Sequence, residues 1–226
     1  MSAARAEYLW ATEGNAYTPS EEWHVERKAG RAISIDTHWY ESSADFARRY
    51  LKVAGAGKLL SVASPIFEAR ELADDGWDVT YLDVRKPPRG VKWVKGDASK
   101  MPFADGSFDA LSSSCVICHV GLGRYGDEKS NSGDMDMMRE CRRVLKPGAL
   151  AQITLPIVDS VTVYRVGNCH RVYPAVAGLE MAEMAGFKVE RYAIWATLAQ
   201  RWMTAQDEPL SRDLNTPDYM SLLLRA

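Results

Sequence analysis

The sequence predicts an α/β protein in which a mostly parallel sheet of seven strands carries helices on both faces. Short apolar runs alternate with amphipathic stretches along the 226 residues, which is the pattern of strand–helix–strand units. Such units join neighbouring strands by crossovers and therefore build parallel sheets that are covered on both sides. With 46% hydrophobic and 26% charged residues, the composition is that of an ordinary globular domain.

The first half of the chain is expected to hold three strands, which are residues 58–63, 78–84 and 91–94. A helix is predicted over residues 42–53, because Ser42 or Ser43 can cap it and Phe46, Tyr50 and Leu51 share one face. A second helix, 65–75, ends near Gly76. A further helix is expected over residues 21–31.

The second half repeats the alternation. A polar turn, 104–107, introduces an apolar strand at 108–114, and a helix over 135–145 stops at Lys146-Pro147-Gly148. Met137, Met138 and Cys141 face inward from that helix. The remaining expected elements are a strand at 149–156, a helix at 179–186 and strands at 187–195 and 219–225. The polar stretch 204–219 is expected to be an exposed excursion between the last two strands.

Composition excludes several classes of function. A net charge of −2 gives no electrostatic footprint for nucleic acid. No apolar run approaches the roughly 18–20 residues of a membrane span, and no secretory signal is visible, so we expect a cytoplasmic protein with no membrane partner. One domain is expected overall, with residues 1–45 as an N-terminal cap on a domain of residues 46–226. The sequence does not indicate an oligomeric state.

The four cysteines do not predict a metal site. Cys115 to His119 reads C-x-x-C-H, the haem-attachment pattern, but it continues the apolar run that begins at Ala110. Cys141 and Cys169 lack the spacing of a second zinc-ligand pair. We therefore interpret Cys115 and Cys118 as small apolar residues.

Polar residues follow four of the predicted strands. In parallel sheets, ligands bind beyond the carboxyl ends of the strands, where the strand order switches direction. The segments expected there are 61–65, 83–85, 97–99 and 114–119. Asp83 lies about twenty residues past the first strand, where a carboxylate can accept hydrogen bonds from a ribose diol. Instead of binding a ligand, Asp83 could be a solvated carboxylate at the end of a strand, and Asp97 could be a residue that forms a turn.

The order of parts from Lys95 to Pro147 resembles the second half of class I S-adenosylmethionine-dependent methyltransferases, and the resemblance extends over residues 58–195. A narrower match looks like a methyltransferase-like family with an HVGLGRYGD signature at residues 119–127, followed by Gly133-Asp134, 145–148 and 170–173. The resemblance implies the Rossmann-like methyltransferase fold and S-adenosylmethionine as cofactor. It also implies that Asp97 and the Ala98 amide meet the adenine.

The first loop departs from the family pattern of an acid and three spaced glycines. Ser61 stands for the acid and Ala63 for the first glycine, while Pro65 lacks an amide donor. We interpret this as a remodelled site, since Asp83 and Asp97 are kept. The expected cofactor-binding residues are Ser61, Ala63, Ser64, Pro65, Asp83, Val84, Arg85, Asp97, Ala98, Ser114, Cys115 and Arg171.

The catalytic candidates are His119, Tyr125, Asp127 and His170. His119 follows the fourth strand and is a natural base near neutral pH, although a loop-ordering hydrogen bond to backbone is an equal alternative. Arg171 is expected to pair with a carboxylate, either Asp127 or the methionyl group of the cofactor. The glycines of the signature lack the Lys-Ser/Thr ending of a phosphate-binding loop. Aromatic residues before the first clear helix could cover the sulfonium as a lid: Tyr8, Trp10, Tyr17, Trp23, Trp39 and Tyr40.

Three functions are consistent with the sequence. The first is methyl transfer to a small-molecule substrate by in-line displacement at the sulfonium. The second is a cyclase or lyase that uses S-adenosylmethionine as its sole substrate and releases methylthioadenosine, as in azetidine-carboxylate formation. The third is a non-catalytic methyltransferase-like binding protein, whose only support is the altered first loop.

Overall fold

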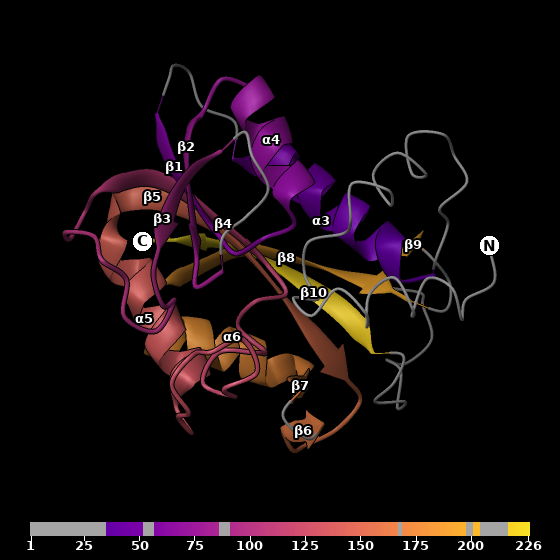
Figure 1. The fold of residues 1–226 in the computed structure, drawn as a ribbon. Helices are drawn as coiled ribbons and strands as arrows, with labels where there is room; N and C mark the ends of the chain where they lie inside the picture. The colour runs from indigo at the N-terminus through magenta and orange to yellow at the C-terminus, as the bar shows by residue number, and fades with distance from the viewer. Residues whose placement is uncertain (1–34, 52–56, 86–90, 167–168, 198–200, 204–216) are drawn as a thin grey trace.

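The computed structural model describes residues 35–51, 57–85, 91–166, 169–197, 201–203 and 217–226. Two helices, α3 (Ile35–Tyr50) and α4 (Ile66–Asp74), cover one face of a twisted sheet. The other face carries α5 (Gly133–Val144) and α6 (Ala175–Met184), as Figure 1 shows. The expected helix at 21–31 and most of the cap lie outside the described residues. So do four of the aromatic residues expected in the lid, which are Tyr8, Trp10, Tyr17 and Trp23.

The sheet has the spatial order β3-β2-β1-β4-β5-β10-β8-β9. The five strands from β3 to β5 in this order are parallel to one another, and β10 is antiparallel to both β5 and β8. The order therefore reverses between β1 and β4, which creates a switch point. The strand bounds are β1 Lys58–Val62, β2 Asp78–Asp83, β3 Lys92–Lys95, β4 Phe108–Ser114, β5 Leu145–Val158, β8 Lys188–Ala196, β9 Arg201–Trp202 and β10 Asp218–Arg225.

The predicted mostly parallel sheet with helices on both faces is confirmed, but within the described residues it has ten strands rather than seven. The additional strands are β6 (Tyr164–Val166), β7 (His170–Pro174) and β9. β7 pairs in parallel with the last residues of β5, and β6 folds back on β7. Each of these strands is five residues or shorter, so none gives a clear apolar period in the sequence.

Local chemistry sets the helix bounds. Pro65 and Pro174 directly precede α4 and α6, where their fixed φ favours the start of a helix. The sequence prediction placed α6 four residues too late, because Gly178 interrupts the helical pattern. Gly178 packs on Leu155, and an added Cβ would lie 3.0 Å from Leu155 Cδ1, so a small residue is needed there.

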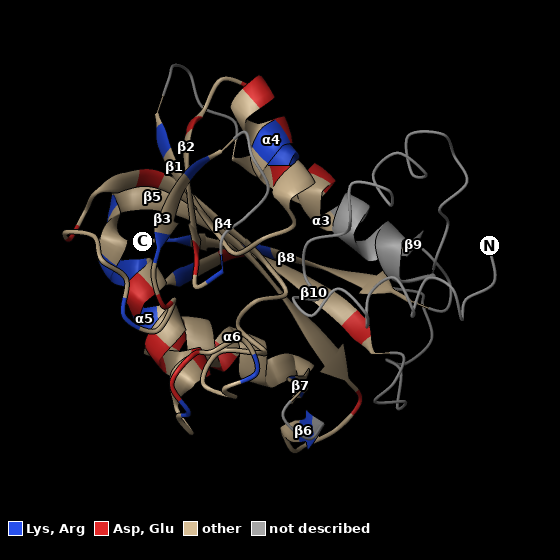
Figure 2. Cartoon of the chain, in the orientation of Figure 1, with Lys and Arg blue, Asp and Glu red and all other residues tan. Residues whose placement is uncertain are grey.

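Two hydrophobic layers hold the sheet between its helices. Met137, Met138 and Cys141 of α5 are fully buried in the larger layer, as predicted. The smaller layer joins Phe46 of α3 and Leu72 of α4 to the opposite face of the sheet. Charges of both signs are interspersed along α4 and α5 (Figure 2), and α5 has acids in its first turn and Arg142 and Arg143 in its last, which complements the helix dipole.

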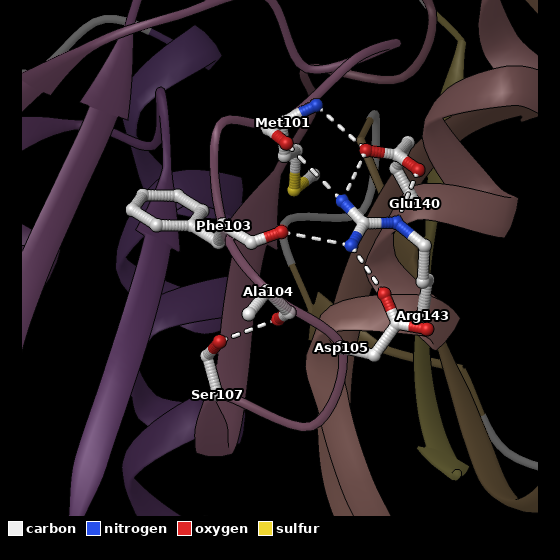
Figure 3. A network of polar contacts seen from close by, with 7 residues as sticks. All are labelled: Met101, Phe103, Ala104, Asp105, Ser107, Glu140 and Arg143. Carbon is white, nitrogen blue, oxygen red and sulfur yellow. Dashed lines mark hydrogen bonds and ion pairs between the residues drawn. The ribbon is translucent and has the colours of Figure 1, made fainter.

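Arg143 fastens the turn before β4 to α5. Its guanidinium donates to the carbonyl oxygens of Phe103 (2.8 Å) and Met101 (3.1 Å) and to Asp105 Oδ1 (2.7 Å), as Figure 3 shows. Glu140 accepts from the Met101 amide at 2.7 Å and pairs with Arg143 at 2.6 Å. The turn leads into β4, so this network fixes where the central strand begins.

Replacing Arg143 with Ala should destabilise the protein by about 1–3 kcal/mol, because the charge-assisted bonds to the turn are lost and two carbonyl groups lose their donor. Urea unfolding at pH 7 measures this as a lower midpoint with an unchanged m value. Arg139→Ala, on the exposed face of the same helix, is the control and should change stability by less than about 0.5 kcal/mol. Equal effects of the two substitutions would contradict the role of the network.

Candidate functional site

A pocket of about 490 Å³, including space open to solvent, lies at the carboxyl ends of β1, β2 and β4. This is the edge of the sheet that the sequence predicted. Leu82, Gly96, Val116 and Val120 also line it and were not predicted. Gly96 could have been found by its place before Asp97: a Cβ there would meet Leu82 at 2.7 Å and Pro102 at 2.8 Å. The predicted residues that line the pocket are Ala63, Asp83, Val84, Arg85, Asp97, Ala98, Cys115, His119, Tyr125 and Asp127.

Asp83 ends β2 and is engaged by its near neighbour Arg85. Asp83 Oδ1 accepts from the Arg85 amide at 2.9 Å and from Nε at 3.0 Å, and Oδ2 accepts from Nη2 at 2.7 Å. Both side chains are largely buried, with 4% and 12% of their areas exposed. The guanidinium carbon of Arg85 also lies 4.8 Å from the centre of the Tyr125 ring. The ion pair thus connects the loop after β2 with the loop after β4.

Asp97 follows β3 and forms a tight turn. Its Oδ1 accepts from the Ser99 amide (2.8 Å) and the Ser99 hydroxyl (2.7 Å). Within the described residues no hydrogen bond to Oδ2 is recorded, so this oxygen can accept a donor from a ligand. The Gly96 amide donates to the Asp83 carbonyl oxygen at 3.3 Å and holds the two acidic loops together.

Two residues that line the pocket have left-handed backbone conformations without being glycine. Ala63 has φ of +43° and Cys115 has φ of +59°. Such a conformation costs an L-residue roughly 1–2 kcal/mol. Ala63 stands where the family pattern has its first glycine, and it adopts a left-handed conformation, which glycine adopts most easily.

The segment 119–127 is a loop that is organised by its own carboxylate. Asp127 Oδ2 accepts from the amides of Gly121 (2.8 Å) and Gly123 (3.1 Å), and Oδ1 accepts from the Tyr125 amide (3.1 Å). Gly121 and Gly123 have φ of +80° and +71°, which directs these amides toward one point. The geometry therefore makes Asp127 a loop-ordering residue at the rim of the pocket.

His119 is buried and lies on the pocket wall. Its Nδ1 is 2.6 Å from the carbonyl oxygen of Cys169, which can only accept, so Nδ1 carries the hydrogen. In the neutral ring Nε2 is then a hydrogen-bond acceptor. The rings of His119 and Tyr125 meet edge to face with centroids 5.9 Å apart. This arrangement suits a base that is oriented by backbone.

Arg171 pairs with a different carboxylate from the two that were expected. Its Nε lies 3.5 Å from Asp134 Oδ2, and Nη1 donates to the Val120 carbonyl oxygen at 2.7 Å. It does not line the pocket. Its hydrogen bond to Val120 instead holds β7 against residues 119–127, the signature loop. His170 also lies outside the lining, with its ring 6.0 Å from that of His119. Burial, and then the charge of Arg124, hold the pKa of His170 below its ordinary value.

Four residues of the predicted cofactor set are turned away from the pocket. Strand alternation directs Ser61 between the sheet and the α3/α4 layer, where its hydroxyl is buried and has no hydrogen-bond partner among the described residues. Pro65 is buried at the start of α4. Ser64 Oγ accepts from the Ser114 amide at 3.0 Å, and Ser114 Oγ donates to Glu68 at 2.5 Å, so both hydroxyls are used in the interior.

Cys115 and Cys118 are buried free thiols with their sulfur atoms 3.7 Å apart. Burial raises the pKa of the Cys118 thiol well above its ordinary value. In the described part of the chain no cluster of three or more His, Cys, Asp or Glu residues could hold a metal ion. No helix there is long and apolar enough to cross a membrane.

Comparison with known proteins agrees with this geometry. Residues 66–153 match the family described as "Methyltransferase domain". A demethylmenaquinone methyltransferase of Chlorobaculum tepidum is 30% identical over 161 residues, which cover 66% of this chain. The chain spans 62% of the length of that relative. A protein of the same name from Corynebacterium urealyticum is 29% identical over 178 residues, which are 74% of this chain and 69% of the relative.

Solved structures of low sequence identity share the fold. The 1,6-didemethyltoxoflavin-N1-methyltransferase of Burkholderia thailandensis matches 99% of this chain and 87% of its own, with a TM-score of 0.64 and 12% identity. The [4+2]-cyclase SpnF matches 82% of this chain and 80% of its own, with a TM-score of 0.61 and 18% identity. The solved structures show the Rossmann-like methyltransferase fold, and together with the matched domain they support assignment of the chain to the class I S-adenosylmethionine-dependent methyltransferase superfamily.

Proposed function

We propose that this chain binds S-adenosylmethionine and transfers its methyl group to a small-molecule acceptor. The observation that carries the proposal is the position of Asp83 and Asp97, which line one pocket from the adjacent loops after β2 and β3, at the carboxyl edge of the sheet. The relatives are named as methyltransferases of demethylmenaquinone, a small molecule. A solved neighbour was crystallised with S-adenosylhomocysteine.

The described residues fit the adenosyl part of the cofactor. Asp97 offers Oδ2 to the exocyclic amine, and the Ala98 amide suits a ring nitrogen. Leu82 and Val116 supply apolar walls for the purine. Asp83 suits the ribose diol, but Arg85 already donates three hydrogen bonds to its carboxylate. The ribose therefore shares Asp83 with Arg85 through the remaining acceptor capacity of Oδ2.

The bound cofactor supplies an electrophilic methyl carbon on its sulfonium. The acceptor atom forms the new bond to this carbon while the sulfur–carbon bond breaks, and the acceptor loses a proton. His119 is our candidate to take that proton, and because Nδ1 donates to the Cys169 carbonyl group the proton would be taken on Nε2. The loop that the Asp127 carboxylate holds together by hydrogen bonds carries both His119 and Tyr125. In this proposal the methyl acceptor binds on the side of the pocket that these two residues line.

Product analysis separates this reaction from the alternatives. With an acceptor present, methyl transfer yields S-adenosylhomocysteine and a methylated product. Methylthioadenosine formed from S-adenosylmethionine alone would show a cyclase or lyase instead, and this fold does include a cyclase. If calorimetry detected no cofactor binding at all, the proposal would fail in favour of a non-catalytic protein.

Asp83→Ala and Asp97→Ala should each weaken S-adenosylmethionine binding by about 1–3 kcal/mol, or about 5- to 150-fold, because each removes a charged hydrogen-bond acceptor. Calorimetry on folded variants measures the dissociation constants. Asp78→Ala is a matched control, since Asp78 is exposed at the opposite end of the strand that Asp83 ends. An unchanged affinity in either site variant would refute that residue's assignment.

His119→Asn should lower kcat by about 10²- to 10⁴-fold, which is the usual contribution of a general base. The Asn amide can still donate to the Cys169 carbonyl group, so the loop keeps an anchor while the base is lost. The dissociation constant of S-adenosylmethionine should stay within about threefold of wild type. A large loss of cofactor affinity with kcat preserved would show that His119 orders the pocket and does not act as the base.

A further inference from the structure

A group of buried polar side chains surrounds Glu68 between the sheet and the helices α3 and α4. Glu68 has 0% of its surface exposed, although it belongs to a helix with charged neighbours. It contacts two hydroxyl groups of β4: Ser112 Oγ lies against Oε1, and Ser114 Oγ lies 2.5 Å from Oε2. The other buried members of the group are Ser43, Gln152, Thr154 and Ser221.

These side chains form one connected network. Gln152 lies 2.8 Å from Ser112 through Oε1, and through Nε2 it lies 2.9 Å from Ser43 and 2.7 Å from Thr154. Ser43 Oγ is in turn 2.8 Å from Ser114 Oγ and 2.7 Å from Thr154 Oγ1. Thr154 Oγ1 is 2.9 Å from Ser221 Oγ. A ring therefore runs from Glu68 through Ser112, Gln152, Ser43 and Ser114 back to Glu68.

Counting hydrogens favours a protonated, neutral Glu68. The network contains eight hydrogen bonds, and each needs one hydrogen. The five hydroxyl groups and the amide of Gln152 supply only seven, whichever way that amide is turned. A proton on Glu68 supplies the eighth: Glu68 donates to Ser112, Ser112 to Gln152, Gln152 to Ser43, Ser43 to Ser114 and Ser114 to the second Glu68 oxygen.

The charges around Glu68 agree with a neutral group. Burial is the main cause that raises its pKa, and the side-chain hydrogen bonds that join it to Ser112, Ser114 and Ser64 oppose it only in part. The Ser64 hydroxyl brings its own hydrogen, so it does not change the count. The titratable groups that act on it or on which it acts are Glu71 on its own helix and Tyr81 on β2. The charge of Glu71 raises the pKa of Glu68 further.

The network reaches the pocket through its backbone. Ser114 directly precedes Cys115, and Ser64, which accepts from the Ser114 amide at 3.0 Å, directly follows Ala63. The Tyr81 hydroxyl donates to the Ser64 carbonyl oxygen at 2.6 Å. Ala63 and Cys115 are the two described non-glycine residues with positive φ, and both line the pocket. The neighbours of both strained residues are thus held from behind by the hydrogen bonds of Glu68 and its partners.

We propose that Glu68 is a positioning residue for cofactor binding: a neutral carboxylic acid that closes the hydrogen-bonded ring and so keeps Ala63 and Cys115 in the shape of the pocket floor. The neutral state is inferred from the geometry of the network and does not depend on the proposed function. The positioning role rests on the proposed function, because it concerns the pocket assigned to S-adenosylmethionine. Glu68 does not touch that pocket and is not a catalytic residue.

Ionisation of Glu68 would remove one hydrogen from the ring, so stability should fall as the pH rises. The unfolded carboxyl group loses its proton near pH 4.3, whereas the folded one keeps it to higher pH. Between these two values the equilibrium constant for folding falls about tenfold per pH unit on account of this group. Glu68→Gln has no such proton, and its amide can donate to Ser112 while its carbonyl group accepts from Ser114. The difference between wild type and Glu68→Gln in the pH dependence of the free energy of unfolding isolates the contribution of the Glu68 proton.

The decisive experiment compares Glu68→Gln, Glu68→Leu and wild type. Infrared difference spectra at pH 7 should show the carbonyl stretch of a protonated carboxylic acid in wild type and not in Glu68→Gln. By calorimetry, the dissociation constant of S-adenosylmethionine for Glu68→Gln should lie within about threefold of that for wild type. At high pH, where Glu68 ionises, wild type should bind more weakly relative to the variant. Glu68→Leu should bind at least about tenfold more weakly. Wild-type affinity in Glu68→Leu would overturn the positioning role.

A second pair of variants covers the case in which Glu68→Leu does not fold. Ser112→Ala opens the ring and should weaken cofactor binding, whereas Ser113→Ala, an equally buried neighbour outside the ring, should not. Equal affinities of these two variants would also overturn the positioning role. The absence of the infrared band would overturn the neutral state. If wild type bound no cofactor, the proposed function and the positioning role would both fail, and the infrared band would still decide the protonation of Glu68.

Discussion

Backbone strain at the floor of the pocket is the constraint on which the site depends. Ala63 and Cys115 hold left-handed conformations that the surrounding structure must enforce. The Ala63 amide donates to the Leu82 carbonyl oxygen at 2.7 Å, and the Cys115 amide donates to that of Thr154 at 3.0 Å, so each turn is fastened to a neighbouring strand. A glycine-rich loop adopts such turns at little cost. In this chain the hydrogen bonds to the flanking strands and the interior network hold the two residues in these conformations. They offset the cost of a left-handed turn without glycine.

The signature loop divides its residues between shape and chemistry. Gly121, Gly123 and Asp127 form a closed unit in which three backbone amides satisfy one carboxylate. Gly133 is part of this packing, because a Cβ there would lie 2.6 Å from the Val120 carbonyl oxygen. His119 and Tyr125 are the side chains that this unit presents to the pocket. A long and unusual motif therefore follows from two simultaneous demands: a stable loop and an oriented imidazole ring.

Local sequence patterns predict most of the fold and the place of the pocket. The side-chain contacts within the site depend on residues that are distant in the sequence, so the sequence does not predict them. Alternating apolar strands and amphipathic helices placed Asp83 and Asp97 at adjacent strand ends, since parallel strands share one carboxyl edge. The sequence could not show that Arg85 turns back onto Asp83, or that the partner of Arg171 is Asp134. Nothing in the sequence points to Glu68, because a Glu in the first turn of a helix usually faces solvent. Its burial depends on serines of β4, more than forty residues away.

The ion pair of Asp83 and Arg85 limits how the proposed cofactor enters. Separating a buried pair without replacing its partners costs about 3–5 kcal/mol, so the guanidinium must keep an acceptor when the ribose arrives. Asp83 Oδ1 already accepts two hydrogens and Oδ2 accepts one, which leaves acceptor capacity on Oδ2. Arg85 also lies over the Tyr125 ring, where a cation is favourable. Sharing of the carboxylate, with Arg85 staying between β2 and the signature loop, is therefore favoured over displacement, and it would link the cofactor side of the pocket to the side that carries His119.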